Sequence, residues 1–440
     1  MGQVGEKEGM TAGSYWEATA GAIKEDRQLV GDARFDVAII GAGYTGLSAA
    51  LKLAACGVSV CVLDARRVGW GASGRNGGFC CFGGTKRNYP DLVRQYGLDE
   101  TRRFVAYQCE AMDLVGERLA SWDVDAARHS RGEVYLAHRP KDFEGFAPEA
   151  EYLNSNFGLG ARVLSREEAA RRGLSGPEFH GAMHVPQGFA LHPLRYVLAL
   201  AGKVRNLGAR IFAHSEVTSM KREGSDWRLV TRLGSVRAPR VLLAGNAYSR
   251  EGAPAWLSGR LLPVMSSILV TRPLSDDELS EQGWTSGLMA ADTRTLLHYF
   301  RLMPDRRFLF GTRGGIFETP EALKRMQMRG RADFERMFPA WANVETEYAW
   351  HGHVALNRNR TAFTGPVPGM DGVFASLAYH GSGVAMASLC GEKVGGMILG
   401  QVKPQDLPLV LGSAPRKFPL PALRQLYLLG AYGWYGIRDR

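Results

Sequence analysis

The sequence lacks three features that would assign it to other classes of protein. It has no run of about 18 apolar residues, which excludes a membrane-spanning helix. It has no block of about five like charges, so its net charge of +10 predicts no nucleic-acid partner. Its six cysteines form no CxxC pair and have no histidines at zinc spacing, which predicts free thiols, no metal site and a reducing compartment.

The first 33 residues also contain no apolar signal segment, so we expect a cytoplasmic protein with an extended or partly ordered tail over residues 1–33. Apolar residues make up 45% of the 440-residue chain and charged residues 22%, which favours a large core and two or three domains. The 54 glycines are clustered, and clustered glycine indicates backbone that approaches a ligand or another chain segment closely.

A βαβ unit opens the chain after this tail. Phe35–Gly41 is a short apolar run typical of a buried parallel strand, and Tyr44–Cys56 has apolar residues at helical spacing before Gly57. Val58–Leu63 is a second β-branched strand. The unit spans about 30 residues, which is the length that a Rossmann-like dinucleotide fold requires.

The turn inside this unit reads Gly41-Ala42-Gly43-Tyr44-Thr45-Gly46, a GxGxxG motif between strand and helix. Its glycines allow a tight turn, a close approach by a pyrophosphate and tight packing of helix on strand. The helix N-terminus supplies N–H groups and partial positive charge for the diphosphate. Asp64, 18 residues after Gly46, is placed to bind ribose hydroxyls. The motif alone does not distinguish FAD from NAD.

Two further glycine-rich segments favour FAD. Residues 69–78 (GWGASGRNGG) directly follow the βαβ unit and predict backbone wrapped around an extended ligand, which a nicotinamide enzyme would not normally need there. Residues 379–384 (YHGSGV) lie between a predicted strand and a predicted helix. The N–H groups of that turn are suited to stabilise negative charge on a reduced isoalloxazine ring.

The rest of the sequence alternates between predicted helices and predicted strands. Helices are predicted over 100–125, 140–175, 194–207, 317–338 and 384–399, and strands over 132–137, 210–213, 227–231, 241–244, 296–302, 307–311 and 373–378. The nucleotide-binding domain is therefore expected to form from separated segments, with a second domain inserted between them.

These motifs resemble the D-amino-acid-oxidase-like family of FAD-dependent oxidoreductases. The segment from FDVAIIGAGYTGLSAALKLA to RRVGWGASGRNGG, together with Ala244-Gly245-Asn246-Ala247-Tyr248, is most similar to the gamma-glutamylputrescine oxidase branch. The similarity also covers His192-Pro193, Tyr299-Phe300-Arg301, Trp350-His351-Gly352 and the C-terminal residues 434–440, so it spans nearly the whole chain after residue 14.

The resemblance implies an α/β fold: an FAD-binding Rossmann-like domain built from discontinuous segments, plus an inserted α+β substrate domain with a large mixed or antiparallel sheet. The expected FAD-binding segments are 34–100, 178–245 and 350–402, and the expected substrate-binding segments are 101–177 and 246–349. Residues 403–440 are expected to pack on the body as a C-terminal tail. The motifs and the resemblance together predict cofactor contacts from Gly41, Gly43, Tyr44, Thr45, Gly46, Asp64, Ala65, Arg66, Arg67, Gly71, Ala72, Ser73, Arg75, Asn76, Gly77, Gly78, Val217, Gly245, Gly381, Ser382, Gly383 and Val384.

The chain departs from the family pattern in two places. Sarcosine oxidases of the family attach FAD to a cysteine, but the matching residues 357–365 (NRNRTAFTG) contain none, so we expect noncovalent FAD. Glycine-oxidase-like members place an arginine soon after a Trp-x-Gly. Here that stretch, residues 350–355, reads WHGHVA without arginine, which argues against a simple α-amino acid held in the usual way.

Four side chains are candidates for the catalytic group. His380 lies in the predicted flavin turn, and Tyr299 and Arg301 share one face of a predicted strand. His351 shares a strand face with His353. Each of the four also has a structural reading, as a capping, packing or solvent-facing residue, and flavin-dependent amine oxidation has no obligatory acid or base.

The predicted activity is oxidation of an amine C–N bond by hydride transfer to FAD, followed by hydrolysis of the imine and reoxidation by O2. A gamma-glutamylated polyamine or related amine is the expected substrate. Two alternatives stay open: an FAD-dependent dehydrogenase of an amino acid or cyclic imino acid such as pipecolate that passes electrons to a quinone, and a non-catalytic flavin-binding partner protein. Residues 418–440 mix apolar and basic residues, which suits a packed helix or contact with a membrane surface. The sequence predicts no particular oligomeric state.

Overall fold

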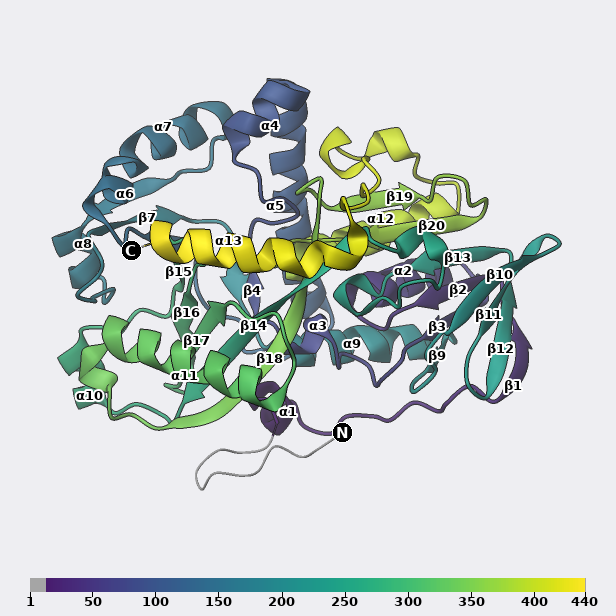
Figure 1. The fold of residues 1–440 in the computed structure, drawn as a ribbon, viewed down its shortest axis with the longest axis horizontal. Helices are drawn as coiled ribbons and strands as arrows, with labels where there is room; N and C mark the ends of the chain where they lie inside the picture. The colour runs from purple at the N-terminus through teal and green to yellow at the C-terminus, as the bar shows by residue number, and fades with distance from the viewer. Residues whose placement is uncertain (1–12, 440) are drawn as a thin grey trace.

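The computed structural model describes residues 13–439, and its nucleotide-type sheet contains the predicted βαβ unit (Figure 1). Strands β2, β3, β9, β13 and β20 run parallel, and β19 is antiparallel to β20. The order is β19-β20-β13-β2-β3-β9, with bounds Phe363–Pro366, Val373–Leu377, Arg240–Leu243, Val37–Ile40, Val60–Leu63 and Arg210–Phe212. The strands predicted at 35–41, 58–63, 210–213, 241–244 and 373–378 are confirmed.

Side chains alternate across this sheet and bury both faces. Val37 and Ile39 pack under helices, while Ala38 and Leu243 pack on the opposite side. The helices are α2 (Tyr44–Ala55), α5 (Leu98–Ser121), α9 (Pro193–Asn206) and α12 (Val384–Ile398). The opposite face is covered by a four-stranded sheet of order β1-β12-β11-β10, with bounds Gly31–Arg34, Gly234–Ala238, Asp226–Val230 and Ser219–Glu223.

A larger mixed sheet forms the other half of the molecule, at the left of Figure 1. Its order is β18-β14-β17-β16-β15-β5-β7-β6, and only β15 and β5 pair in parallel. The bounds in that order are Thr346–Asn357, Leu261–Thr271, Phe308–Arg313, Tyr299–Leu302, Met289–Asp292, Glu133–Leu136, Gly181–Val185 and Arg162–Ser165. The predicted α/β fold with a large mixed sheet is confirmed.

An aromatic core packs on the outer face of this large sheet. Phe300, Phe308 and Phe310 alternate with inward-facing residues, and the rings of Phe308 and Phe310 contact Phe334 of α11 (Pro320–Met337). Helices α8 (Arg166–Arg171) and α10 (Asp276–Gln282) extend this layer. The inner face of the large sheet is directed toward the nucleotide-type sheet and its loops.

The shorter elements complete the chain. They are α3 (Ala72–Arg75), β4 (Phe79–Cys80), α4 (Tyr89–Tyr96), α6 (Pro140–Glu144), α7 (Phe146–Phe157), β8 (Phe189–Ala190) and the 3-10 turns at Asn246–Tyr248, Ala255–Leu257, Pro339–Trp341, Pro404–Asp406, Leu409–Leu411 and Pro421–Leu423.

The predicted division of the chain differs from the structure at α5, β7 and β18. Most of α5 falls in a segment expected to bind substrate (101–177), but the helix packs against α12 beside the six-stranded sheet. β7 and β18 fall largely in segments expected to belong to the FAD-binding domain (178–245 and 350–402), but both pair within the eight-stranded sheet. β6 interrupts the helical stretch predicted over 140–175. β18 was misplaced because an edge strand with one exposed side has the same local pattern in either sheet.

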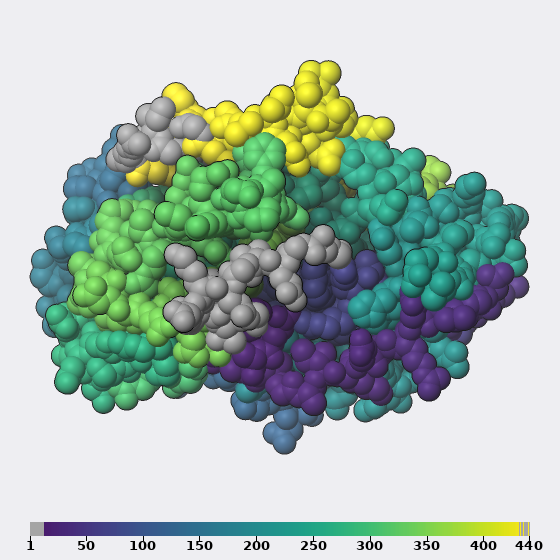
Figure 2. Space-filling model, turned by 60° about the horizontal axis from the view of Figure 1, so that its bottom comes forward, coloured from purple at the N-terminus to yellow at the C-terminus, as the bar shows by residue number. Residues whose placement is uncertain are grey.

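The N-terminal segment is integrated into the body from residue 13 onward. Helix α1 (Tyr15–Thr19) begins at a capping box between Ser14 and Glu17. Trp16 is 1% exposed, and its indole N–H donates to Asn76 O at 2.9 Å. Figure 2 shows this purple segment running along one side of the molecule. The extended or partly ordered tail expected over 1–33 thus includes a short helix whose Trp16 is buried in the body, followed by residues 21–30 without regular secondary structure, and residues 1–12 lie outside the described part.

The C-terminal helix α13 (Arg424–Arg438) crosses the front of the molecule in Figure 1. Leu428 on its inner side packs against Leu262 and Val264 of β14. Its outer side exposes Leu426, Leu429 and Trp434. Over the described residues, no helix combines the length and apolarity needed to traverse a bilayer.

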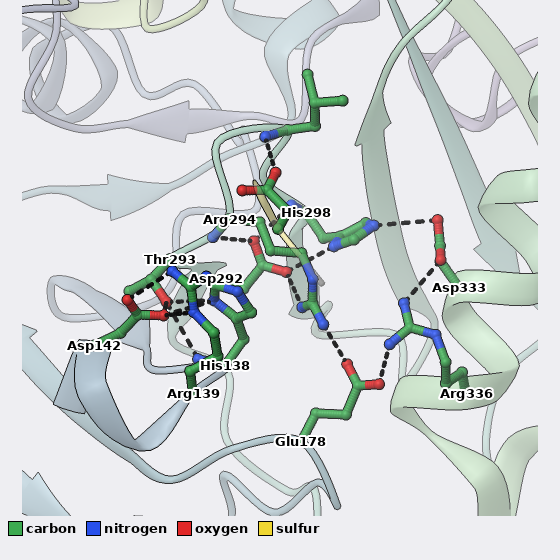
Figure 3. Close-up of polar contacts among 12 residues, drawn as sticks. His138, Arg139, Asp142, Glu178, Asp292, Thr293, Arg294, His298, Asp333 and Arg336 are labelled. Carbon is green, nitrogen blue, oxygen red and sulfur yellow. Dashed lines mark hydrogen bonds and ion pairs between the residues drawn. The ribbon is translucent and has the colours of Figure 1, made fainter. Parts of the chain in front are cut away.

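A polar network anchors the strand that carries Tyr299 (Figure 3). Asp292, at the end of β15, accepts hydrogen bonds from His298 Nδ1 and Arg294 Nη1, both at 2.6 Å. His298 Nε2 lies 3.3 Å from Asp333 of α11. Arg294 also pairs with Glu178 at 2.7 Å. Because His298 directly precedes Tyr299, the network fixes where β16 begins.

The network predicts a pH-dependent stability. Burial lowers the pKa of His298, but the bonds to Asp292 and Asp333 outweigh it and raise that pKa from 6.5 to about 9. A raised folded-state pKa stabilises the fold fully below pH 6.5, and the stabilisation is lost as the pH rises through about 9. We expect the unfolding free energy to fall by about 1–3 kcal/mol over this window, measured by urea denaturation.

His298→Asn should flatten that pH dependence. His214→Asn is the control, since His214 is an exposed histidine with φ of 51°, which asparagine tolerates. An equal slope in wild type and His298→Asn contradicts the assignment.

Candidate active site

The predicted cofactor residues collect at one edge of the six-stranded sheet. Gly41 follows β2, Asp64 follows β3, Gly245 follows β13, and the 379–384 turn follows β20. All four strands are parallel neighbours, so their carboxyl ends share an edge. Val217 follows β9, the next strand along. Ligands of open parallel sheets bind at this edge, where the strand order reverses; here that point lies beside β2.

The GxGxxG turn is held together by backbone contact. A Cβ on Gly46 would lie 1.9 Å from Gly41 O, so the start of α2 rests directly on the turn. Gly41 has φ of 115°, and its own Cβ would lie 2.8 Å from Ala244 O. Gly43 caps α2 without a side-chain hydrogen bond. The first-turn N–H groups of α2 therefore point to the sheet edge, where they suit an anion.

Asp64 joins this turn to the next loop. Its carboxylate accepts from Ala42 N at 2.7 Å and from Arg66 N at 2.8 Å. Burial outweighs these bonds and raises the pKa of Asp64. Each carboxylate oxygen keeps capacity for a further donor, and ribose hydroxyls supply donors of that kind. Ala65 is exposed at the head of the same loop.

The loop 69–78 is braced from several sides. Ser73 Oγ accepts from Tyr44 N at 3.0 Å, which ties the loop to the start of α2. Arg75 Nε donates to Trp70 O at 2.7 Å, and Asn76 Oδ1 accepts from Gly78 N at 2.7 Å. Gly71 lies against the ring of Tyr248, where a Cβ would approach to 3.2 Å. The polar residues of the loop thus fix its conformation through hydrogen bonds.

Arg67 has a buried donor that suits an anion. Its Nη2 pairs with Glu17 of α1, whereas its Nη1 is buried without a hydrogen-bond partner. A buried unpaired N–H is costly, and the diphosphate of a dinucleotide would satisfy it.

The turn 379–384 closes the site. Its ordered conformation includes positive φ at His380 (58°) and Gly381 (101°). Tyr379 OH lies 2.8 Å from Thr45 Oγ1, which links the turn to α2. Gly383 caps α12 without a side-chain hydrogen bond, and Ser382 and Val384 flank it. The N-termini of α2 and α12 thus open on the same sheet edge.

His380 is buried in this turn with both ring nitrogens unpaired. Burial, followed by the charge of Lys86, lowers its pKa to about 3, so the imidazole is neutral at pH 7. A neutral ring with a free lone pair and a free N–H can bind a polar ligand group.

Tyr299 meets the cofactor loop from the large sheet. Its ring lies where Cβ atoms on Gly77 and Gly311 would clash, at 2.7 and 2.1 Å. Its hydroxyl lies 3.0 Å from Ser266 Oγ. The structure therefore brings Tyr299 to the glycine-rich loop, and only glycine at positions 77 and 311 leaves room for the ring.

Arg301 lies on the same sheet face as Tyr299, as its strand spacing predicted, but it faces a different space. Its Nη2 donates to Leu191 O at 2.9 Å and its Nη1 to His129 Nε2 at 3.1 Å. It borders a cavity of about 190 Å³ with Trp16 and His192. Burial lowers the pKa of Arg301 to about 9. These contacts give Arg301 a role in joining β16 to the segments of His129 and Leu191.

His351 is not brought to Tyr299. His351 of β18 pairs with Ser267 of β14, whereas the next pair along the two strands is Gly352 with Ser266. Because side chains alternate along a strand, His351 lies on the opposite face of the sheet from Gly352 and Tyr299. Its carbonyl accepts from Arg75 Nη1 at 3.3 Å. His353 lies on the same face, with its Nε2 2.7 Å from Glu318 Oε1.

Three charged residues near the 379–384 turn were not predicted. Arg313 ends β17 in register with Ser266, Lys86 follows β4, and Glu133 begins β5. Arg313 could have been found from the alternation of side chains along its strand. It lies two residues after Gly311, so it faces the same side of the sheet as Gly311 and its cross-strand partner Tyr299. Lys86 lies in a polar loop and gives no signal of its own.

The residues present fit FAD. The edge offers two helix N-termini, the carboxylate of Asp64, the unpaired Arg67 Nη1 and a second glycine-rich loop in contact with Tyr299. A dinucleotide with a flat ring system at one end is the ligand that uses all of them.

Comparison with known proteins gives a consistent result. The model of a family described as "DAO: FAD dependent oxidoreductase" matches residues 36–397. Gamma-glutamylputrescine oxidoreductase of Escherichia coli (strain K12) is 29% identical over 434 residues, 97% of this chain and 98% of that protein. The probable oxidoreductase OrdL of Haemophilus influenzae is 31% identical over 368 residues, 83% of each chain. Glycine oxidase of Geobacillus kaustophilus has the same fold, with a TM-score of 0.69, 20% identity and coverage of 84% of this chain and 96% of that chain.

The glycine contact at the start of α2 makes a direct prediction. Gly46→Ala forces its Cβ against Gly41 O and should destabilise the fold by about 1–3 kcal/mol and prevent retention of flavin. Gly202→Ala is the control, because nothing lies within 4 Å of a Cβ at that position in α9. Flavin-to-protein ratio and thermal unfolding measure both effects, and full flavin content in Gly46→Ala would refute the role given to this turn.

Proposed function

Since the chain belongs to the DAO family of FAD-dependent oxidoreductases, we propose that it oxidises the C–N bond of an amine and that a gamma-glutamylated polyamine is its substrate. The similarity over 97% of the chain to gamma-glutamylputrescine oxidoreductase carries this proposal. The arrangement of the site also supports the proposal. The edge of the six-stranded sheet that suits a dinucleotide faces the large sheet, and Tyr299 lies where the two meet.

The proposed cofactor contacts follow from the sheet edge. The N–H groups at the start of α2 and Arg67 would hold the diphosphate, Asp64 the ribose, and Val217 the adenine end. The loop 71–78 and the 381–384 turn would hold the ring system. When bound, FAD accepts a hydride from the carbon next to the amine nitrogen.

The chain's own residues position the substrate and exclude water. Tyr299 fills the space between Gly77 and Gly311, so bulk water is kept from that junction. The neutral His380 adds no positive charge that would repel a substrate cation, and its free nitrogens can orient a polar group. The electrons leave the substrate with the hydride, and water then hydrolyses the resulting imine to an aldehyde and the freed amine.

The electron acceptor defines the second candidate function, an amino-acid or cyclic imino-acid dehydrogenase coupled to a quinone. The apolar side chains exposed on α13, Leu426, Leu429 and Trp434, favour it because quinones reside in membranes. Under the first candidate, O2 takes the electrons and is reduced to hydrogen peroxide.

Anaerobic mixing tests the proposal. The purified protein should be yellow, and gamma-glutamylputrescine should bleach the flavin faster than free putrescine or pipecolate does. Peroxide formation in air assigns O2 as acceptor, and turnover only with a quinone dye assigns the dehydrogenase. A flavin that none of the three amines bleaches would overturn the proposed function and leave the non-catalytic alternative.

We also infer that FAD is held noncovalently, because residues 357–365 contain no cysteine. Precipitation of the protein with acid should release all of the yellow colour into the supernatant. Flavin that stays with the precipitate after washing would contradict this inference.

A further inference from the structure

The outer side of α13 is apolar. Residues 425–437 (QLYLLGAYGWYGI) contain no charged residue. Leu426, Tyr427 and Trp434 are 54%, 43% and 64% exposed, and their spacing places them on one side of the helix, opposite the buried Leu428. A row of exposed apolar side chains along a helix is typical of an interaction surface.

The body of the protein holds α13 by its ends and its inner side. Before the helix, Phe418 N donates to Gly259 O at 2.8 Å. After it, the carboxylate of Asp439 accepts from Thr295 N at 3.0 Å. Leu428 packs on β14 between these two attachments. The outer side therefore stays directed away from the body, as the position of the yellow helix in Figure 1 shows.

A cluster of cations adjoins the start of this helix. Asn359 Nδ2 donates to Ala414 O at 3.0 Å, and its Oδ1 accepts from Arg416 N at 3.2 Å. These bonds tie the turn 358–360 to the segment that leads into α13. The exposed cations that gather beside Asn359 are Arg358, Arg360, Arg416 and Lys417. Over the described residues 13–439, none of the four forms an ion pair.

The C-terminal segment supplies no acid to balance this cluster. Residues 407–438 contain no Asp or Glu, and Glu251, which reaches α13 from the body, pairs with Arg424. Exposed cations beside an exposed apolar helix are typical of a helix that lies in the interface of an anionic membrane. Trp434 is an amphipathic ring of the kind that is enriched at that depth.

A second copy of the chain would match this surface less well than a membrane does. A two-fold contact between the outer sides of two α13 helices would cover the apolar residues. The same contact would bring α13 against itself, and its segment offers no acid to the cations. The surface of an anionic membrane supplies an apolar layer and negative charge together.

We propose that the outer side of α13 and the adjoining cations bind the enzyme to the surface of an anionic membrane. The helix lies along that surface, with its apolar side chains at the boundary between headgroups and acyl chains and the cations against the lipid phosphates. The proposal does not depend on which amine is oxidised. It places the enzyme beside any quinone dissolved in the membrane.

Flotation of the flavin-loaded, full-length protein with vesicles tests the proposal without an amine. Vesicles of phosphatidylcholine mixed with phosphatidylglycerol are compared with vesicles of phosphatidylcholine alone. The partition coefficient should be about 10-fold or more higher for the anionic vesicles, because each basic residue near an anionic surface strengthens binding about 5-fold. Added salt should weaken this binding by screening the charges. Failure to float with either vesicle, or equal binding to both, overturns the proposal.

Two double variants assign the binding to this surface. Leu426→Gln with Trp434→Gln removes apolar area from the outer side of α13 and should lower the partition coefficient on anionic vesicles about 10-fold. Arg416→Gln with Lys417→Gln should lower it about 10-fold or more and reduce its dependence on salt. Wild-type binding in both variants contradicts the assignment.

Matched controls lie elsewhere on the surface. Leu207, at the end of α9, is 46% exposed, and Lys221 and Arg232 are exposed cations of β10 and of the turn after β11. Leu207→Gln, and Lys221→Gln with Arg232→Gln, should bind vesicles like the wild type. A loss in these controls equal to that in the α13 variants shows that any apolar or charged residue has the same effect, which also overturns the proposal.

Two further measurements separate the remaining outcomes. If Leu426→Gln with Trp434→Gln lowers the molar mass of the protein in solution and leaves vesicle binding unchanged, α13 is an interface between copies and the proposal is wrong. If that variant does not fold, the Arg416→Gln and Lys417→Gln pair and the comparison of the two vesicles still decide. Vesicle binding together with no oxidation of any gamma-glutamylated amine keeps the membrane surface and rejects the proposed function.

Discussion

The contact between Gly46 and Gly41 O is the constraint on which the site depends. It lets α2 begin directly against the end of β2, and the adjacent loops are then bonded to that start. Ser73 holds the second glycine-rich loop to Tyr44 N, and Thr45 holds the 379–384 turn through Tyr379. A side chain at position 46 would move all of these attachments together, so the cofactor edge behaves as one unit.

The large sheet contributes the other half of the site through strand alternation. One face is filled by the aromatic core of Phe300, Phe308 and Phe310, which leaves the residues between them for the inner face. Tyr299, Gly311 and Arg313 flank the phenylalanines at positions that face inward. The buried Asp292–His298 pair fixes the start of β16, so packing on the outer face sets the position of Tyr299 on the inner one.

The cofactor edge could be predicted from the sequence because its signals are local. A strand, a GxGxxG turn and a helix follow one another within 30 residues, and Gly41, Gly46 and Asp64 can be placed without knowing any distant contact. The facing sheet could not be placed in the same way. Arg313 and Lys86 are 227 positions apart in the printed sequence. The pairing of β17 with β14 places Arg313 beside the 379–384 turn, and the packing of the segment after β4 against that turn places Lys86 there. His351 shows the converse, since a suggestive His-x-His spacing lies on the opposite sheet face.

The central claim is that the carboxyl edge of the six-stranded sheet and the inner face of the large sheet enclose one flavin. A crystal structure of the flavin-loaded protein tests it most directly. The account predicts the diphosphate at the N-terminus of α2, beside Ser73 and Arg67, and the ring system between the 381–384 turn and the sheet face that carries Tyr299. A diphosphate bound away from α2, or a ring system bound away from Tyr299, would contradict the account.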